Sequence, residues 1–281
     1  AVPISAAAAY LFVRAFETAS SERVSRRFVA VALFLLPSIN FWSIFLGKDV
    51  WIFFFLALVT FSFAKMLEGN RRRDVVGLGI GLIAIFVLRP HVGMTISAAV
   101  ALVLVVRPLR LSGAAAYLRP VYRMCALAVV ATAFVMLSGK ILSTIGVKAL
   151  TLEALADRAW AAQVGFSTTE GGSSLPVVLQ SGDPLAVTLF IPFGVTTLLF
   201  RPFLWEAHNA VALISAVENL FLLGLVLWRW RSLVAAVAAA RRQPFMLFVL
   251  VSFTITSILL SFDWNLGTTQ RHRTMVLPYL L

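Results

Sequence analysis

The sequence has very little cysteine and few charged side chains, and each shortage excludes a class of protein. Cys125 is the single cysteine, so neither a disulfide framework nor a cysteine-based metal site can form within the chain. Charged residues make up 13% of the 281 residues, whereas 60% are hydrophobic and the mean hydropathy is +0.94. Soluble globular domains do not have this composition. We therefore expect a membrane protein.

Acidic residues are scarcer than basic ones. The chain has 24 Lys and Arg against 12 Asp and Glu, which gives a formal charge of +12. Such an excess can indicate nucleic-acid binding, but here the basic residues lie in short clusters between apolar runs and not on a polar module. We expect no nucleic-acid partner, because topology and anionic lipid explain these clusters better.

Long apolar runs fill most of the chain. They predict an all-α, polytopic transmembrane helical bundle with about 8–10 membrane segments. The first and last runs are cut short, so we expect residues 1–281 to be a single membrane domain of a longer protein. The runs lie at about 1–16, 28–46, 50–67, 75–88, 92–106, 124–142, 185–200, 207–228, 243–262 and 275–281.

The basic clusters predict which loops face the cytoplasm. Three apolar runs separate Arg123 from Arg229, one too many for both to face the same side. The weakest run is 185–200, which contains Pro192 and Gly194, so we expect it to be interfacial or re-entrant. If it spans instead, one part of the chain moves to the other face. The clusters are Arg23, Arg26 and Arg27; Arg71, Arg72 and Arg73; Arg107, Arg110, Arg119 and Arg123; and Arg229, Arg231, Arg241 and Arg242.

This topology places residues 143–206 outside the membrane. The stretch "TLEALADRAWAAQ" predicts an amphipathic helix capped by Thr151, and the glycine- and serine-rich "STTEGGSS" follows it. We expect the region to form a small extracytoplasmic cap.

Cationic side chains from several connections then gather on the outer face, against the trend that keeps Lys and Arg inside. An anion at the interface explains them, because arginine offers a rigid fork of donors to phosphate oxygens. A lipid-linked diphosphate is the natural candidate. The alternative for any single member is a side chain that only extends to the headgroups. The candidate substrate-binding residues are Lys48, Arg89, His91, Arg201, His208, Arg271 and Arg273.

Carboxylates in the same layer are candidates for acid–base chemistry. We predict that Asp49, Glu206, Asp263 or His272 acts as general base toward a sugar hydroxyl, without choosing among them. The histidines lack metal-ligand spacing, so we name no metal ligand; a divalent cation such as Mg or Mn would be held by carboxylates.

Glu218 differs from these acids because it lies near the middle of the run 207–228. A carboxylate at that depth is costly and is usually paired or functional. Two interpretations stay open: a structural pair with an arginine or Asn219, and a role in transport or catalysis.

Four stretches carry a resemblance to a known group: "LPSINFWSIFLGKD", "LRPHV", "FRPFLWEAHNAVALISAVEN" and "NLGTTQRHRTMVLP". They resemble segments of bacterial inner-membrane proteins of exopolysaccharide and O-antigen assembly, which are similar to lipid-carrier-dependent glycosyltransferases and polymerases of the GT-C kind. The resemblance implies a multi-pass inner-membrane protein with an outward site that binds a polyprenyl-diphosphate-linked glycan and transfers sugar. The partners would be membrane lipid, that glycan and other assembly proteins. Such enzymes carry a catalytic acid in their first outer loop, which we expect to precede residue 1.

Two other functions compete with glycan assembly. A transporter or flippase would line a path with ionisable groups at mid-membrane depth, and only Glu218 is placed so. A non-catalytic assembly subunit would disperse its charges and pack helices through small residues. The stretch "GLGIGL", Gly77 to Leu82, hints at close helix packing.

Overall fold

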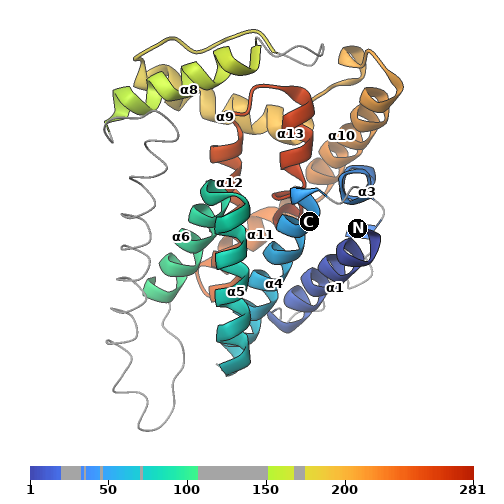
Figure 1. Ribbon diagram of the computed structural model, residues 1–281, viewed down its shortest axis with the longest axis vertical. Helices are drawn as coiled ribbons and strands as arrows, with labels where there is room; N and C mark the ends of the chain where they lie inside the picture. The colour runs from blue at the N-terminus through green and yellow to red at the C-terminus, as the bar shows by residue number, and fades with distance from the viewer. Residues whose placement is uncertain (20–32, 35, 45–46, 70–71, 107–150, 168–174) are drawn as a thin grey trace. The chain divides into compact units, whose positions relative to one another are not determined.

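The computed structural model describes residues 1–281 except 20–32, 35, 45–46, 70–71, 107–150 and 168–174 (Figure 1). Every secondary-structure element in the described part is a helix, so the all-α prediction is confirmed there. The predicted segment 124–142, part of 28–46 and several of the basic-cluster arginines lie outside the described residues. Their predicted roles stay predictions.

The helices fall into two compact units. The first unit comprises Ala1–Leu137, Arg231–Phe253 and Leu277–Leu281. In it, α4 packs against α1 and α5, and α5 packs against α6. Its described helices are α1 (Val2–Ala19), α3 (Pro37–Ile44), α4 (Lys48–Gly69), α5 (Arg72–Leu88), α6 (Pro90–Val106), most of α11 (Trp230–Ala240), the first part of α12 (Pro244–Leu260) and α14 (Leu277–Leu280).

The second unit comprises Ser138–Trp230 and Thr254–Val276. Here α9 packs against α8, α10 and α13. Its described elements are α8 (Leu152–Ser167), α9 (Pro184–Phe200), the 3-10 turn η2 (Leu204–Glu206), α10 (Ala210–Trp228), the second part of α12 and α13 (Leu266–Arg273). The prediction of one membrane domain with a cap at 143–206 concerns placement in a bilayer and stays a prediction.

Helix boundaries follow local chemistry. Four of the described helices begin at proline, namely Pro37, Pro90, Pro184 and Pro244. Proline suits a first helical position because its missing N–H would lack an intrahelical partner there. In α8, Thr151 caps the helix as predicted, since its Oγ1 accepts the Ala154 N–H at 3.1 Å.

Glycine lets α4 and α5 approach closely. A Cβ built on Gly77 would lie 2.6 Å from Ser62 Oγ, and one on Gly81 would lie 2.6 Å from Val59 Cγ2. Gly79, between them, has open space around it. The close packing predicted from "GLGIGL" is therefore confirmed for two of its glycines.

Within the described residues, two helices, α4 and α10, are long and apolar enough to cross a membrane. A third span exists if α11 and α12, bent by 116° at the break between them, count as one. Exposed apolar side chains cover α10, among them Phe221 and Trp228. Lipid is the environment that such a surface fits, so the structure supports membrane association. The segment 185–200 forms α9, a shorter apolar helix that continues through Pro192.

Candidate functional site

Polar side chains on and before α13 form a cluster in the second unit, and local contacts determine where this helix begins. Asn265 is the N-cap, and its side-chain oxygen accepts the N–H groups of Gly267 and Thr268 at 3.0 and 3.3 Å. Just before it, the buried Trp264 donates its indole N–H to the Pro176 carbonyl at 2.7 Å. The cap of Asn265 and the bond of Trp264 therefore fix the position at which α13 begins.

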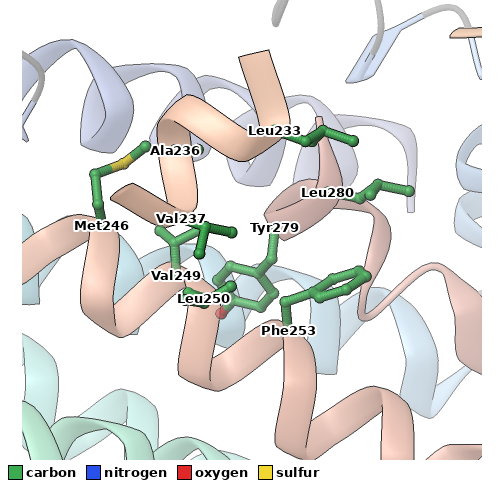
Figure 2. Close-up of a pocket in the computed structure, with 9 residues that line it drawn as sticks. All are labelled: Leu233, Ala236, Val237, Met246, Val249, Leu250, Phe253, Tyr279 and Leu280. Atoms are coloured by element: carbon green, nitrogen blue, oxygen red, sulfur yellow. The ribbon is translucent and has the colours of Figure 1, made fainter. Parts of the chain in front are cut away.

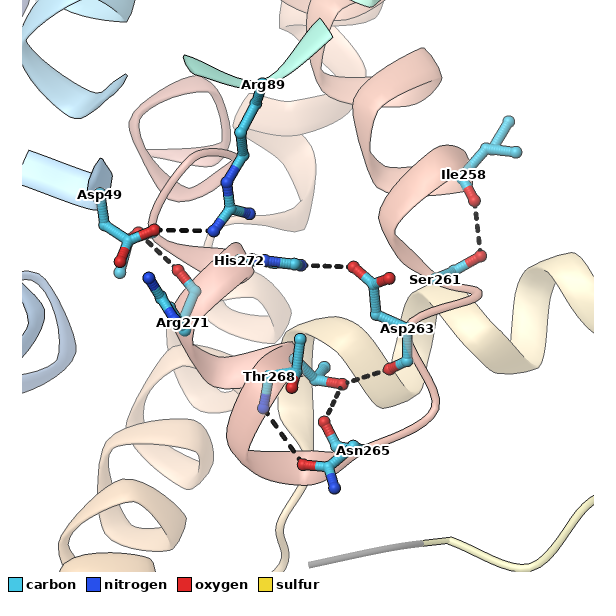
Figure 3. A network of polar contacts seen from close by, with 11 residues as sticks. Asp49, Arg89, Ile258, Ser261, Asp263, Asn265, Thr268, Arg271 and His272 are labelled. Carbon is cyan, nitrogen blue, oxygen red and sulfur yellow. Dashed lines mark hydrogen bonds and ion pairs between the residues drawn. The ribbon is translucent and has the colours of Figure 1, made fainter. Parts of the chain in front are cut away.

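Asp263 and His272 form a carboxylate–imidazole pair across this turn (Figure 3). The Nδ1 atom of His272 points at Oδ2 of Asp263, with side-chain exposures of 11% and 23%. When Nδ1 donates its proton to the carboxylate, Nε2 keeps the lone pair that a general base needs. Two predicted catalytic residues are therefore brought together in one unit.

Arg273 follows His272 but points into the interior of the second unit. Its side chain is fully buried and lies 3.4 Å from the equally buried carboxylate of Glu218 in α10. It also donates to Asn219 Oδ1 and, at 3.2 Å, to the Leu199 carbonyl. Burial lowers the pKa of Arg273 and the charge of Glu218 opposes that change, yet arginine stays charged in proteins. The arginine partner that one interpretation of Glu218 requires is thus observed.

The loop between α9 and α10 contains a second ion pair of this unit. Arg201 binds the Glu206 carboxylate through Nε at 3.1 Å and through Nη2, and the Phe203 N–H donates to the same carboxylate at 2.9 Å. Burial raises the pKa of Glu206, but the bonds from Arg201 and Phe203 and the positive charges of Arg201 and His208 outweigh it. The pKa therefore lies below its ordinary value.

In the first unit, Asp49 and Arg89 pair at the ends of their helices. Arg89 stands in the one-residue turn between α5 and α6, and Asp49 lies in the first turn of α4. The Arg89 Nη2 donates to Asp49 Oδ1 at 2.9 Å, with both side chains largely buried (Figure 3). This short turn delivers Arg89 to a carboxylate.

The remaining candidates occupy more open positions. Lys48 begins α4 and is exposed, as is His208 in the loop before α10. His91 in α6 and Arg271 in α13 are half-buried. Arg271, His272 and Arg273 all occupy the last turn of α13, where positive charge complements the helix dipole.

The predicted phosphate-binding arginines are thus engaged by protein carboxylates at three positions: Arg89, Arg201 and Arg273. Sequence reasoning left open an arginine partner for Glu218 without naming it, but it did not anticipate the Asp49–Arg89 and Arg201–Glu206 pairs. It also did not anticipate the bonds of Asn219, which accepts from Arg273 and donates to the Pro202 carbonyl at 3.0 Å. The polar "EN" inside an apolar run was the one available indication.

A divalent metal finds no ready cage in the described residues, because no three His, Cys, Asp or Glu side chains gather there. The carboxylates of Asp49, Glu206 and Asp263 each face Arg or His instead. The described donor set therefore does not fit a protein-held Mg or Mn, and no chemical step is assigned to one.

Comparison with known proteins leaves the site to be judged on its own geometry. No family model, curated protein or solved structure matches the chain.

Proposed function

We propose that the chain is a membrane-embedded glycan-assembly enzyme that transfers sugar from a polyprenyl-diphosphate-linked donor to a hydroxyl acceptor at the outer face of a bacterial inner membrane. The observation that carries the proposal is the Asp263–His272 pair. The apolar helices α4 and α10 provide the membrane setting that a polyprenyl donor requires. The donor class itself comes from the resemblance of the four sequence stretches.

The chemistry assigned to the pair is general base catalysis. His272 Nε2 takes the proton of the acceptor hydroxyl while that oxygen bonds to the anomeric carbon of the donor sugar. The bond from that carbon to the diphosphate oxygen breaks, and its electron pair leaves with polyprenyl diphosphate. Asp263 holds the imidazole in the required tautomer and stabilises the imidazolium that forms.

Positive charge close to the pair suits the leaving group. Arg271 directly precedes His272 on α13 and is half-buried, and its charge is assigned to the negative charge that develops on the diphosphate. Arg273 is not assigned to phosphate in this mechanism, because Glu218 binds it in the interior. Acid–base chemistry is thus assigned to Asp263 and His272, and diphosphate binding to Arg271.

The test measures release of free polyprenyl diphosphate from polyprenyl-diphosphate oligosaccharide in membranes that contain the protein. His272→Ala should lower the rate by about 10²–10⁴-fold, the usual contribution of a general base. Asp263→Asn should also lower it, because an amide favours the wrong imidazole tautomer. The matched control is Asp157→Asn, since Asp157 on α8 accepts only from the Ser181 hydroxyl at 2.6 Å among the bonds described.

Unchanged release in folded His272→Ala protein would overturn the assignment of the base. Equal losses in Asp157→Asn and Asp263→Asn would reduce the Asp263 effect to a general structural one.

Transport is the less favoured alternative. It depended on Glu218, the sole charged residue of α10, and that carboxylate is bound to Arg273. The described structure offers transport no observation comparable to the Asp263–His272 pair.

A further inference from the structure

The first unit contains an apolar cavity at the bend between α11 and α12 (Figure 2). Its volume is about 180 Å³. Leu233, Ala236 and Val237 form one wall, on a single face of α11. For comparison, an apolar cavity of about 150 Å³ can hold a benzene molecule. The space therefore fits part of a hydrocarbon chain.

The opposite walls come from α12 and α14 and are equally apolar. On α12 the lining side chains Met246, Val249 and Phe253 recur at helical spacing. Tyr279 of α14 presents its ring to the cavity (Figure 2), and its hydroxyl pairs with Thr60 Oγ1 at 3.0 Å. Because that hydroxyl is already bonded to Thr60, a ligand in the cavity would be held by shape and by apolar contacts.

Positive charge stands at the turn that closes this bend. Arg241 and Arg242 follow α11 directly, are both exposed, and are separated from Pro244 at the start of α12 by one residue. Val237 precedes them by one helical turn and Met246 follows by about one. The N-terminus of α12 adds the positive end of its dipole to the same turn.

We propose that the α11–α12 bend binds an anionic phospholipid, with one acyl chain in the cavity and the phosphate at Arg241 and Arg242. Two features about one helical turn apart in the chain suit one amphipathic ligand: a cavity lined by aliphatic and aromatic side chains, and exposed arginines in the turn between α11 and α12. The α11 helix is short, is followed at once by two arginines and exposes Val234, as a helix at the surface of an anionic leaflet does. This site is independent of Asp263 and His272.

The experiment uses the full chain in phosphatidylcholine nanodiscs with a small fraction of phosphatidylglycerol that carries a diazirine in its acyl chain. After illumination, mass spectrometry of peptides locates the adduct. We expect it on residues 233–253, and we expect unlabelled phosphatidylglycerol to compete whereas added phosphatidylcholine does not.

Two variants separate the chain contact from the charge contact. Ala236→Phe fills the cavity and should abolish the adduct, whereas Ala235→Phe adds the same ring at the neighbouring exposed position and should preserve it. Arg241→Gln with Arg242→Gln should weaken competition by phosphatidylglycerol by roughly fivefold per arginine. These two arginines are exposed, so this variant tests the proposal even if Ala236→Phe does not fold.

Adducts spread over other helices, or equal in Ala235→Phe and Ala236→Phe, would overturn the cavity as an acyl-chain site. Equal competition by phosphatidylcholine and phosphatidylglycerol would overturn the anionic specificity.

Discussion

Arg273 and Glu218 form an ion pair that water does not reach: their charged atoms lie 3.4 Å apart, and their side chains are 0% and 2% exposed. Asn219, next to Glu218, accepts a further bond from the same guanidinium. Such an arrangement links α13 to α10, and through the Leu199 carbonyl to the end of α9. It therefore fixes the segment that carries His272.

The buried pair predicts a large penalty for removing one partner. Glu218→Leu should lower the free energy of unfolding by about 3–5 kcal/mol, because it leaves Arg273 charged and unpaired. Glu218→Leu combined with Arg273→Met should regain most of that loss. Unfolding in detergent measures both, and Glu68→Ala in the exposed Lys65–Glu68 pair should cost no more than about 1 kcal/mol. A double variant as unstable as the single one would contradict the pair as the cause.

The α4–α5 contact predicts opposite effects for two neighbouring glycines. Gly81→Ala should destabilise the protein by about 1–3 kcal/mol, since its Cβ would meet Val59 Cγ2 at 2.6 Å and the Phe55 carbonyl at 3.3 Å. Gly79→Ala has open space and should stabilise α5 by up to about 1 kcal/mol through helix propensity. Thermal unfolding of the two variants tests this prediction. A similar shift in melting temperature for both would argue against close packing of α4 and α5.

Glu206 predicts a specific acid sensitivity. Its folded pKa lies below the ordinary value of 4.5, so its contribution to stability is present above pH 4.5 and is lost as pH falls through the folded pKa. Glu206→Gln should therefore be less stable than the unmodified protein near pH 6, and the difference should shrink below pH 4.5. Melting temperatures between pH 6 and pH 3 test this. The control Glu153→Gln, at an exposed position of α8, should lose stability between pH 6 and pH 3 in the same way as the unmodified protein.

The common outer face is a prediction about topology, and exposed residues make it measurable. On a Cys125→Ala background, Lys48→Cys and His208→Cys should react with a membrane-impermeant thiol reagent in intact cells. Arg73→Cys and Arg242→Cys should react only after the membrane is opened, because basic loops face the cytoplasm. All four side chains are exposed in the structure. Labelling of Lys48→Cys and His208→Cys from different sides would disprove a shared outer site.

Local features of the sequence determined the helices. Apolar runs, prolines at helix starts and short polar caps act over a few residues, and so the boundaries of α5, α6 and α9 were predicted to within a few positions. The same local character made Thr151 recognisable as a cap. It also made the last turn of α13 recognisable as a cluster of positive charge.

The tertiary structure decided which charges meet. Glu218 and Arg273 are 55 positions apart in the chain, and Asp49 and Arg89 are 40 apart. Residue types fix only that a buried carboxylate needs a partner, and several arginines qualified. Helix packing within each unit selects the partner, because only packing brings side chains from distant segments within hydrogen-bond distance. For the same reason, composition did not identify Asp263 as the partner of His272. The turn before α13 and the helix itself bring the two side chains together.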